Sequence, residues 1–299
     1  MFQTRKIGDI QVTRIHEYGG PTHDPAFLFP DLDPNDLDRH RSLMTPHHYV
    51  AHMNKLIVEI QFWVVHAGAN IIVVDTGVGN FKQRPGIARM NMLNGLVREW
   101  MIAAGAPPEK VTHVVMTHLH ADHVGWNTSW VDGRWVPTFP NARYYLPGQD
   151  FRFCKEGRNR DPGVVDVFGE SFFDSVMPIV DAGLAEFIDD QREIADCLQV
   201  IAAPGHSPGQ VMFQLRSRGE EGLFCGDVVH SPIQIAMPLV NSGYCIWEDA
   251  ARRSRAEFLT RAADSGALVM PVHFGAPHCG FVRRQQDGFV FEPAQWPTS

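Results

Sequence analysis

The hydrophobic residues of this chain gather in short runs that alternate with turn-forming residues. The run over 111–116 is rich in valine, and a short β-branched run of this kind predicts a buried strand. Runs of the same type predict further strands, over 10–15, 55–66, 69–75, 142–146, 198–202, 211–215, 222–225 and 268–272. Ala67-Gly68 and Asp132-Gly133 each predict a hairpin, because such glycine-containing pairs suit tight turns.

Apolar positions at helical spacing predict two amphipathic helices. One covers Met90 to Ala104 and stops before Gly105-Ala106-Pro107. The other covers Ala250 to Ala263 and turns three arginines toward solvent, Arg252, Arg253 and Arg255. Residues 148–175 are rich in phenylalanine and are expected to be irregular to helical, as a pocket wall, a partner face or ordinary core.

The segment from 19 to 48 interrupts this pattern. Prolines and aspartates replace the alternation, which predicts a long surface loop with one short helix from Pro34 to Met44. We expect this loop to cover the mouth of an active site or a twofold partner, so a homodimer is predicted. No linker, repeat or low-complexity tract divides the rest of the chain, which predicts a single domain over 1–299.

Composition and charge narrow the function. The 299 residues are 44% hydrophobic and carry a net charge of -8, which predicts a large core and argues against nucleic acid as a partner. No apolar stretch is long enough to span a membrane, and no apolar run follows the basic residues of the N-terminus. The five cysteines are scattered and predict reduced thiols in a cytoplasmic protein. A small-molecule substrate remains the expected partner.

Three histidines and one aspartate follow the strand over 111–116 within six positions. His118 and His120 are two residues apart, so in an extended segment they project to the same side. Asp122 and His123 lie on the turn that follows, and Gly125 allows a tight return. Packing does not explain such a cluster, because each buried side chain would need its own partner. The segment therefore predicts ligands for two neighbouring cations.

The spacing H-x-H-x-D-H resembles the signature of the metallo-β-lactamase superfamily of binuclear zinc hydrolases. Four further elements of that family follow the expected order: D-T-G at Asp75, G-H-[ST]-x-G at His206, G-D at Asp227 and a late histidine at His273. The resemblance implies an α+β fold, the four-layer αβ/βα sandwich. It also makes Asp75 a carboxylate that orients a ligand histidine.

The same resemblance assigns the ligands. It places His118, His120 and His206 on a first metal, Asp122, His123 and His273 on a second, and Asp227 between the two. Imidazole and carboxylate donors suit two Zn²⁺ ions, and Mn²⁺, Co²⁺ or Fe²⁺ could use the same set. Two such ions about 3.5–4 Å apart can hold a bridging hydroxide as the nucleophile.

The resemblance leaves the substrate open. The quorum-quenching lactonases have a tyrosine three residues after the bridging aspartate, where this chain has His230; D-x-x-H looks more like the methyl parathion hydrolase branch. Asp122 and His230 are the catalytic candidates, although His230 could equally be a structural histidine. Candidate substrate-binding residues, besides His230, are Trp126, Phe274 and His278. An ester, a lactone or an organophosphate-like molecule is the expected substrate.

Other functions of the same fold stay open. A β-lactam amide or an aryl halide could be the bond cleaved, although β-lactamases of this superfamily commonly place a cysteine near Asp227. An iron-dependent redox enzyme similar to persulfide dioxygenases is the alternative from another class. That branch normally lacks a complete second site, whereas all seven ligand positions are filled here. No pattern for glutathione binding and no inserted nuclease domain is found.

Overall fold

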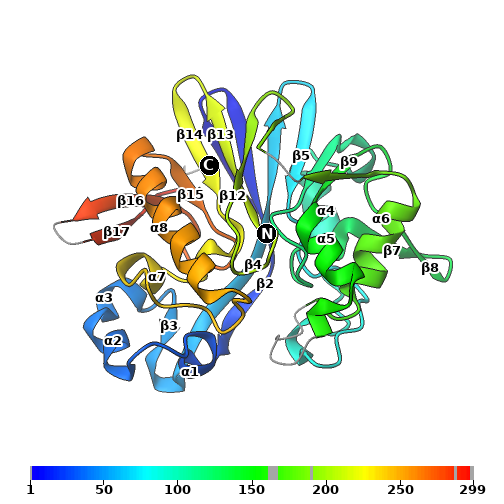
Figure 1. The fold of residues 1–299 in the computed structure, drawn as a ribbon. Helices are drawn as coiled ribbons and strands as arrows, with labels where there is room; N and C mark the ends of the chain where they lie inside the picture. The colour runs from blue at the N-terminus through cyan, green and yellow to red at the C-terminus, as the bar shows by residue number, and fades with distance from the viewer. Residues whose placement is uncertain (1, 161–167, 189–190, 286–287, 297–299) are drawn as a thin grey trace.

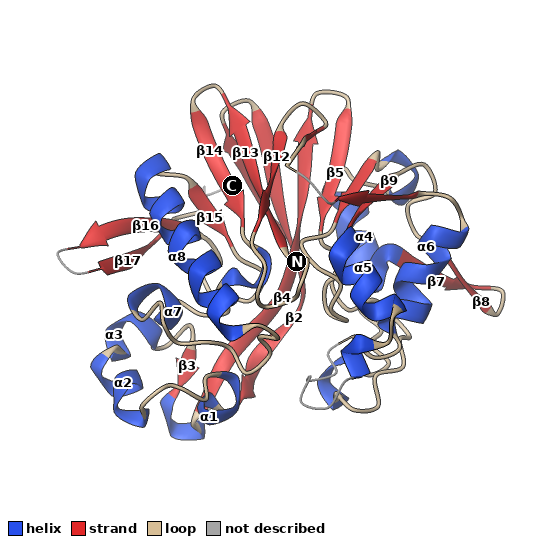
Figure 2. Cartoon of the chain, viewed as in Figure 1, coloured by secondary structure: helices blue, strands red, loops and turns tan. Residues whose placement is uncertain are grey.

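Two mixed β-sheets lie face to face in the centre of the molecule, and helices cover their outer sides (Figures 1 and 2). This arrangement is seen in a computed structural model, which describes residues 2–160, 168–188, 191–285 and 288–296. The core between the sheets contains apolar side chains of both, such as Trp63 of the first and Phe213 of the second. The fold is the four-layer sandwich that the motifs predict.

The first sheet contains the strand that precedes the histidine cluster. Its order is β1 (Phe2–Ile7), β2 (Ile10–His23), β4 (Lys55–Ala67), β5 (Asn70–Val74), β6 (His113–Val115), β9 (Arg143–Pro147) and β10 (Ala185–Ile188), and β3 (Tyr49–Val50) pairs with β4. The four neighbouring strands β5, β6, β9 and β10 are parallel, so the carboxyl ends of β5 and β6 lie at the same edge. The predicted hairpin at Ala67-Gly68 joins β4 and β5.

The other candidate ligands follow strands of the second sheet. Its order is β11 (Glu193–Ile194), β12 (Leu198–Ala202), β13 (Val211–Ser217), β14 (Glu220–Phe224), β15 (Leu268–Met270), β16 (Gly280–Gln285) and β17 (Gly288–Pro293). A separate hairpin, β7 (Thr128–Val131) with β8 (Arg134–Pro137), turns at Asp132-Gly133 as predicted. The predicted strands are thus present, with ends shifted by a few residues.

The helices flank the two sheets on opposite sides (Figure 2). Next to the first sheet lie α4 (Val97–Ala103), α5 (Gly148–Lys155), a π-helical turn (Phe172–Val176) and α6 (Met177–Asp181), and next to the second lie α7 (Ile233–Ala236) and α8 (Glu248–Ser265). Helix α8 confirms the second predicted helix. No helix in the described part of the chain is long and apolar enough to cross a membrane.

The helix predicted over Met90 to Ala104 is too long. Only α4 is α-helical, and Ala88–Met90 forms a single 3₁₀ turn. Between them the Asn91 side chain accepts the N–H of Arg84, and Met92 adopts a φ of 56°. Side-chain to backbone bonds of this kind compete with helix formation, which explains the difference.

Arg255 also departs from prediction, because it is buried rather than exposed. Its Nε donates to the carbonyl of Val228, Nη1 to that of Pro238 and Nη2 to the side chain of Asn241. The solvent face of α8 therefore keeps Arg252 and Arg253, whereas Arg255 fixes the turn that follows Asp227.

The segment over 19–48 is not an irregular loop. Residues up to His23 extend β2, and three short helices follow, α1 (Pro25–Leu28), α2 (Pro34–Arg39) and α3 (Arg41–Met44). Asp24 and Asp33 cap the first two, each accepting a backbone N–H of the following turn, and a proline begins each helix. Helices α2 and α3 together cover the short helix predicted from Pro34 to Met44, whereas α1 and the extension of β2 replace part of the predicted loop. Leu28 and Phe29 pack against Ile233, which joins the segment to the second sheet's side.

Candidate metal centre

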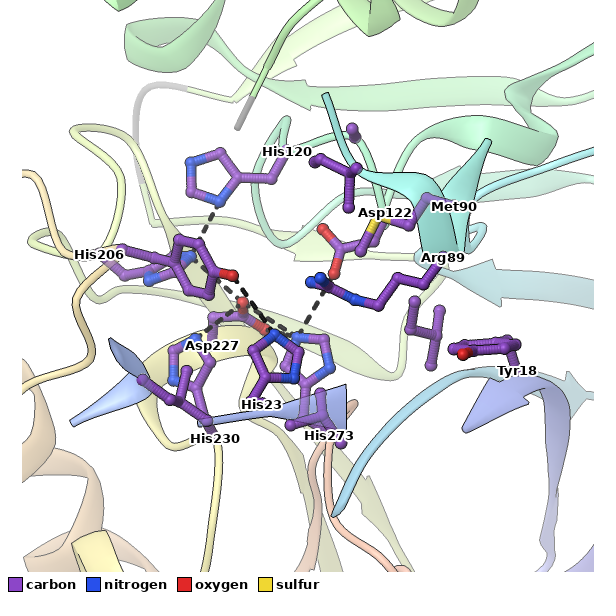
Figure 3. A pocket seen from close by; sticks show the side chains of 16 residues that line it. Tyr18, His23, Arg89, Met90, His120, Asp122, His206, Asp227, His230 and His273 are labelled. Atoms are coloured by element: carbon purple, nitrogen blue, oxygen red, sulfur yellow. Dashed lines mark hydrogen bonds and ion pairs between the residues drawn. The ribbon is translucent and has the colours of Figure 1, made fainter. Parts of the chain in front are cut away.

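The candidate ligands lie at strand ends of both sheets, on loops that meet at one edge of the sandwich. His118, His120, Asp122 and His123 follow β6, whereas His206 follows β12, Asp227 follows β14 and His273 follows β15. Figure 3 shows five of them, His120, Asp122, His206, Asp227 and His273, pointing toward one another. The structure therefore brings together all seven residues that the motifs indicate.

The seven side chains form two groups around one carboxylate. His118, His120 and His206 gather with Asp227, and Asp122, His123 and His273 gather beside them, each group within 4.8 Å. Oδ2 of Asp227 lies 3.8 Å from Nε2 of His118 and 3.2 Å from that of His206. Oδ1 lies 3.3 Å from Nε2 of His123 and 3.1 Å from that of His273. Asp227 thus faces both groups, as a bridging ligand must.

The donor atoms fit a pair of divalent cations. Nε2 of His118, His120 and His123 and Oδ1 of Asp227 are buried and have no hydrogen-bond partner among the described residues. An unpartnered buried polar atom costs about 1–3 kcal/mol, so four converging ones call for an occupant. Imidazole and carboxylate are the donors that zinc prefers at catalytic sites.

Two of the ligand histidines have the neutral ring that metal binding requires. Burial holds the pKa of His118 and His120 well below the usual range, so both rings are neutral. Burial would also lower the pKa of His206, but the charge of Asp227 outweighs it and raises this pKa to about 9. A cation between these two side chains would displace that proton, because a histidine must be neutral to bind a metal.

Two acceptors fix the orientation of ligand rings in the second group. Asp75 lies at the end of β5 and accepts from Nδ1 of His123 over 3.1 Å, as the resemblance implies. The backbone carbonyl of Glu59 lies 2.7 Å from Nδ1 of His273. With Nδ1 engaged, Nε2 of each ring is directed toward Asp227.

Asp150 supports the first group, and the sequence analysis missed it. This buried carboxylate accepts the N–H of Leu119, the hydroxyl of Ser207 and the N–H of Gly209. It therefore joins the loop of His118 and His120 to the loop of His206. No motif marks it, because its role depends on two loops that only the fold brings together.

Glu17 supports the other side of the histidine turn and was also missed. Its carboxylate accepts the N–H groups of Val78 and Gly79 and the indole N–H of Trp126. Burial raises the pKa of Glu17 to about 7, against these hydrogen bonds. Glu17 thus ties β2 to the loop after Asp75 and to the turn after His123.

A pocket of roughly 550 Å³, its open mouth included, leads to the two groups. Its lining combines metal-site residues with apolar and polar ones: Tyr18, His23, Leu28, Val58, Ile60, Ile87, Arg89, Met90, His120, Ala121, Asp122, His206, Asp227, His230, Tyr244 and His273. His23 and Leu28 come from the segment over 19–48, which therefore borders the pocket. Arg89 and Tyr244 lie on loops, and no spacing rule singled them out.

His230 is the one predicted substrate residue outside the ligand set that lines the pocket. The ring is buried, with Nε2 3.2 Å from Oδ2 of Asp227, and it stacks on His273 at 5.4 Å between ring centres. Its two nitrogens have no well-aligned hydrogen-bond partner among the described residues. His230 also groups with Asp227 and His273 as a set that could hold a cation.

Trp126, Phe274 and His278 are not among the residues that line this pocket, so a substrate-binding role for them stays a prediction. The indole of Trp126 belongs to the core beside the first sheet and donates to Glu17. Phe274 is fully buried in the core beside the second sheet. The ring of His278 turns back to the carbonyl of Phe274.

Two facing sheets with a histidine-rich dimetal site at their strand ends define a class, the metal-dependent hydrolases with a metallo-β-lactamase fold. Within that class the chain belongs to the metallo-β-lactamase superfamily, whose sequence model matches residues 59–291. A curated relative is the probable metallo-hydrolase YybB of Bacillus subtilis (strain 168). It is 23% identical over 188 residues, which are 60% of this chain and 69% of that protein.

Two solved structures share the fold over almost the whole chain. AidC, a dizinc quorum-quenching lactonase in complex with a product, is 20% identical, with a TM-score of 0.76 and coverage of 99% of this chain and 98% of AidC. The hydrolase AbOPH of the β-lactamase superfamily is 23% identical, with a TM-score of 0.78 and the same coverage. At these identities the likeness establishes the fold.

Proposed function

We propose that this protein is a binuclear zinc hydrolase that cleaves a small ester, lactone or organophosphate-like molecule. The observation that carries the proposal is the position of Asp227 between the two groups of buried donors. Its Oδ2 lies near His206 and its Oδ1 near His123, and Nε2 of His273 lies 3.1 Å from both oxygens. All donors are imidazoles or carboxylates, which suits zinc. Bound ions would supply Lewis-acid polarisation of the substrate and lower the pKa of water.

The protein's own residues would do the remaining work. Asp75 and the Glu59 carbonyl hold the ligand rings of His123 and His273, so the site is organised before substrate binds. His230 lies at the pocket wall within reach of Asp227 and would donate a hydrogen bond to the oxygen that gains charge. Asp122 lines the pocket and is the carboxylate best placed to accept the proton from water.

The resemblance to lactonases and to AbOPH supports the choice of bond without deciding among esters, lactones and phosphotriesters. A screen of the zinc-loaded protein against members of each group tests the proposal, with metal content measured on the same sample. Two zinc ions per chain together with turnover of one group are expected. One iron per chain and no hydrolysis would contradict the proposal and favour redox chemistry instead.

A further inference from the structure

Arg89 is a cation in the pocket that the metal site does not use. It lies in the 3₁₀ turn Ala88–Met90, between Ile87 and Met90, which also line the pocket. Figure 3 shows its side chain pointing inward on the same side as Asp122. Among the described residues, no carboxylate lies within ion-pair distance of this guanidinium. Its charge therefore has no acidic partner in that part of the chain.

Tyr244 is the group that the guanidinium contacts. Burial raises the pKa of Tyr244, and the positive charge of the neighbouring Arg89 opposes this shift. Nε2 of His23 lies 3.3 Å from the Tyr244 hydroxyl oxygen. The ring of Tyr244 stacks on His230 at 6.4 Å between centres and an angle of 28°. The hydroxyl and the guanidinium are thus held together, next to the histidine that lies beside Asp227.

The surroundings make an unpaired cation costly. Five apolar or aromatic side chains share the pocket wall with Arg89: Tyr18, Leu28, Val58, Ile60 and Met90. They reduce the water around the half-buried guanidinium, so a bound anion would stabilise its charge more than at an open surface. With two divalent ions and a bridging hydroxide bound, the four positive charges would balance the hydroxide and the carboxylates of Asp75, Asp122 and Asp227, and the charge of Arg89 would remain. The pocket then has an excess of positive charge that an anionic ligand would neutralise.

We propose that Arg89 and Tyr244 bind an oxyanion group of the substrate, such as a carboxylate, that is separate from the bond being hydrolysed. This inference rests on the proposed hydrolase function and narrows its substrates to small anionic molecules with an apolar body. The guanidinium supplies two parallel donors that match a carboxylate, and the Tyr244 hydroxyl supplies a third. The apolar wall then contacts the body of the substrate between this group and the metal centre.

A pair of esters that differ in one charge tests the proposal. Mono-4-nitrophenyl glutarate is anionic, and its methyl ester is neutral with the same leaving group. We expect the zinc-loaded protein to have a KM at least about tenfold lower for the anion, the size of one charged hydrogen-bond pair. Arg89→Gln should bring the ratio of the two KM values close to one, and Arg89→Lys should restore part of it. Arg98→Gln removes the same charge from an exposed position of α4 and should keep the wild-type ratio.

Calorimetry supplies a readout that does not depend on turnover. Glutaramate should bind the zinc-loaded protein at least about tenfold more tightly than glutaramide, and Arg89→Gln should remove the difference. Unchanged glutaramate binding in Arg89→Gln would place the carboxylate on the metals and overturn the proposal. Loss of zinc from Arg89→Gln would also overturn the proposal, because Arg89 would then act by holding the metal ligand Asp122 in place and not by binding the substrate.

The two ideas fail in different ways. Hydrolysis of both esters with equal KM values, unaffected by Arg89→Gln, would keep the hydrolase function and remove the anion site. Binding of glutaramate that depends on Arg89, without hydrolysis of either ester, would keep the anion site and remove the proposed reaction. Tyr244→Phe should weaken glutaramate binding less than Arg89→Gln does, since it removes a neutral donor.

Discussion

Asp75 accepts a hydrogen bond from Nδ1 of His123 over 3.1 Å, across 48 residues of sequence. The same carboxylate accepts the N–H and the hydroxyl of Thr117, so it joins the end of β5 to both ends of the histidine turn. Its backbone adopts a φ of 58°, a conformation that non-glycine residues rarely adopt. The strained turn therefore positions a side chain that directs Nε2 of His123 toward Asp227.

Asp75→Ala should weaken metal binding by about 10- to 100-fold, the usual effect of removing a residue that orients a ligand. The loss should fall mainly on the group of Asp122, His123 and His273, because His123 loses its fixed orientation. Competition with a chromophoric zinc chelator would resolve the two affinities. Asp249→Ala, an exposed carboxylate on α8, serves as the control. An equal loss at both sites would contradict the assignment of Asp75 to His123.

Asp227→Ala should reduce the occupancy of both sites, because this carboxylate lies within 3.3 Å of donors from each group. Elemental analysis after gel filtration measures the zinc that stays bound. His120→Ala, in contrast, should reduce the first site and leave most of the second. Two tightly held ions in Asp227→Ala would show that the carboxylate does not bridge.

Glu17→Gln tests, through the pH dependence of stability, how Glu17 holds the loop after Asp75 and the turn after His123. Burial raises the pKa of Glu17 from 4.5 to about 7, so folding keeps the proton at a pH where the unfolded chain has lost it. The stability that this proton contributes is fully present below about pH 4.5 and is lost as the pH rises to about 7. The loss in the free energy of unfolding is at most about 3 kcal/mol. Glutamine cannot ionise, so the variant should gain stability relative to wild type over this range. Urea unfolding of the metal-free proteins at several pH values measures the difference. A difference that is constant with pH would contradict the titration of Glu17.

The histidine cluster over 118–123 could be predicted from the sequence because its chemistry is local, whereas His206, Asp227 and His273 followed only from the family resemblance. Histidines and aspartates crowded behind an apolar run are costly to bury unless they bind a cation, and period-two spacing sets the side to which His118 and His120 project. The pocket could not be predicted in the same way. Arg89, Tyr244 and Asp150 lie on segments without a motif, and only the fold brings them to the site.

Two errors have a common physical cause. Met90 to Ala104 has helical apolar spacing, but side-chain bonds of Asn80 and Asn91 hold its first part in a loop. The stretch around Asp24 was predicted to be loop, but Asp24 caps helix α1. In both cases a short polar side chain bonded to nearby backbone decided the local structure, and hydrophobic periodicity does not record such bonds.

His230→Ala should lower kcat by about 100-fold, if this ring donates to the oxygen that gains charge during hydrolysis. The ring lies within 3.2 Å of Asp227 and lines the pocket, so it can contact both substrate and metal centre. Zinc content distinguishes the roles. A hydrogen-bond donor can be lost with both ions retained, whereas a ligand of the group with Asp227 and His273 would take one ion with it.

A series of leaving groups separates the remaining roles for His230. A proton donor to the leaving group should matter most for alkyl esters, whose leaving groups need a proton, and least for nitrophenyl esters. Equal losses across the series would restrict His230 to binding the oxyanion. If the ring is purely structural, His230→Ala should lower the urea midpoint of unfolding and leave kcat of the folded fraction near wild type. His230→Gln provides the matched control, because its amide can replace one hydrogen bond without exchanging protons. Recovery of nitrophenyl ester turnover by glutamine, without recovery of alkyl esters, would assign both roles to this one side chain.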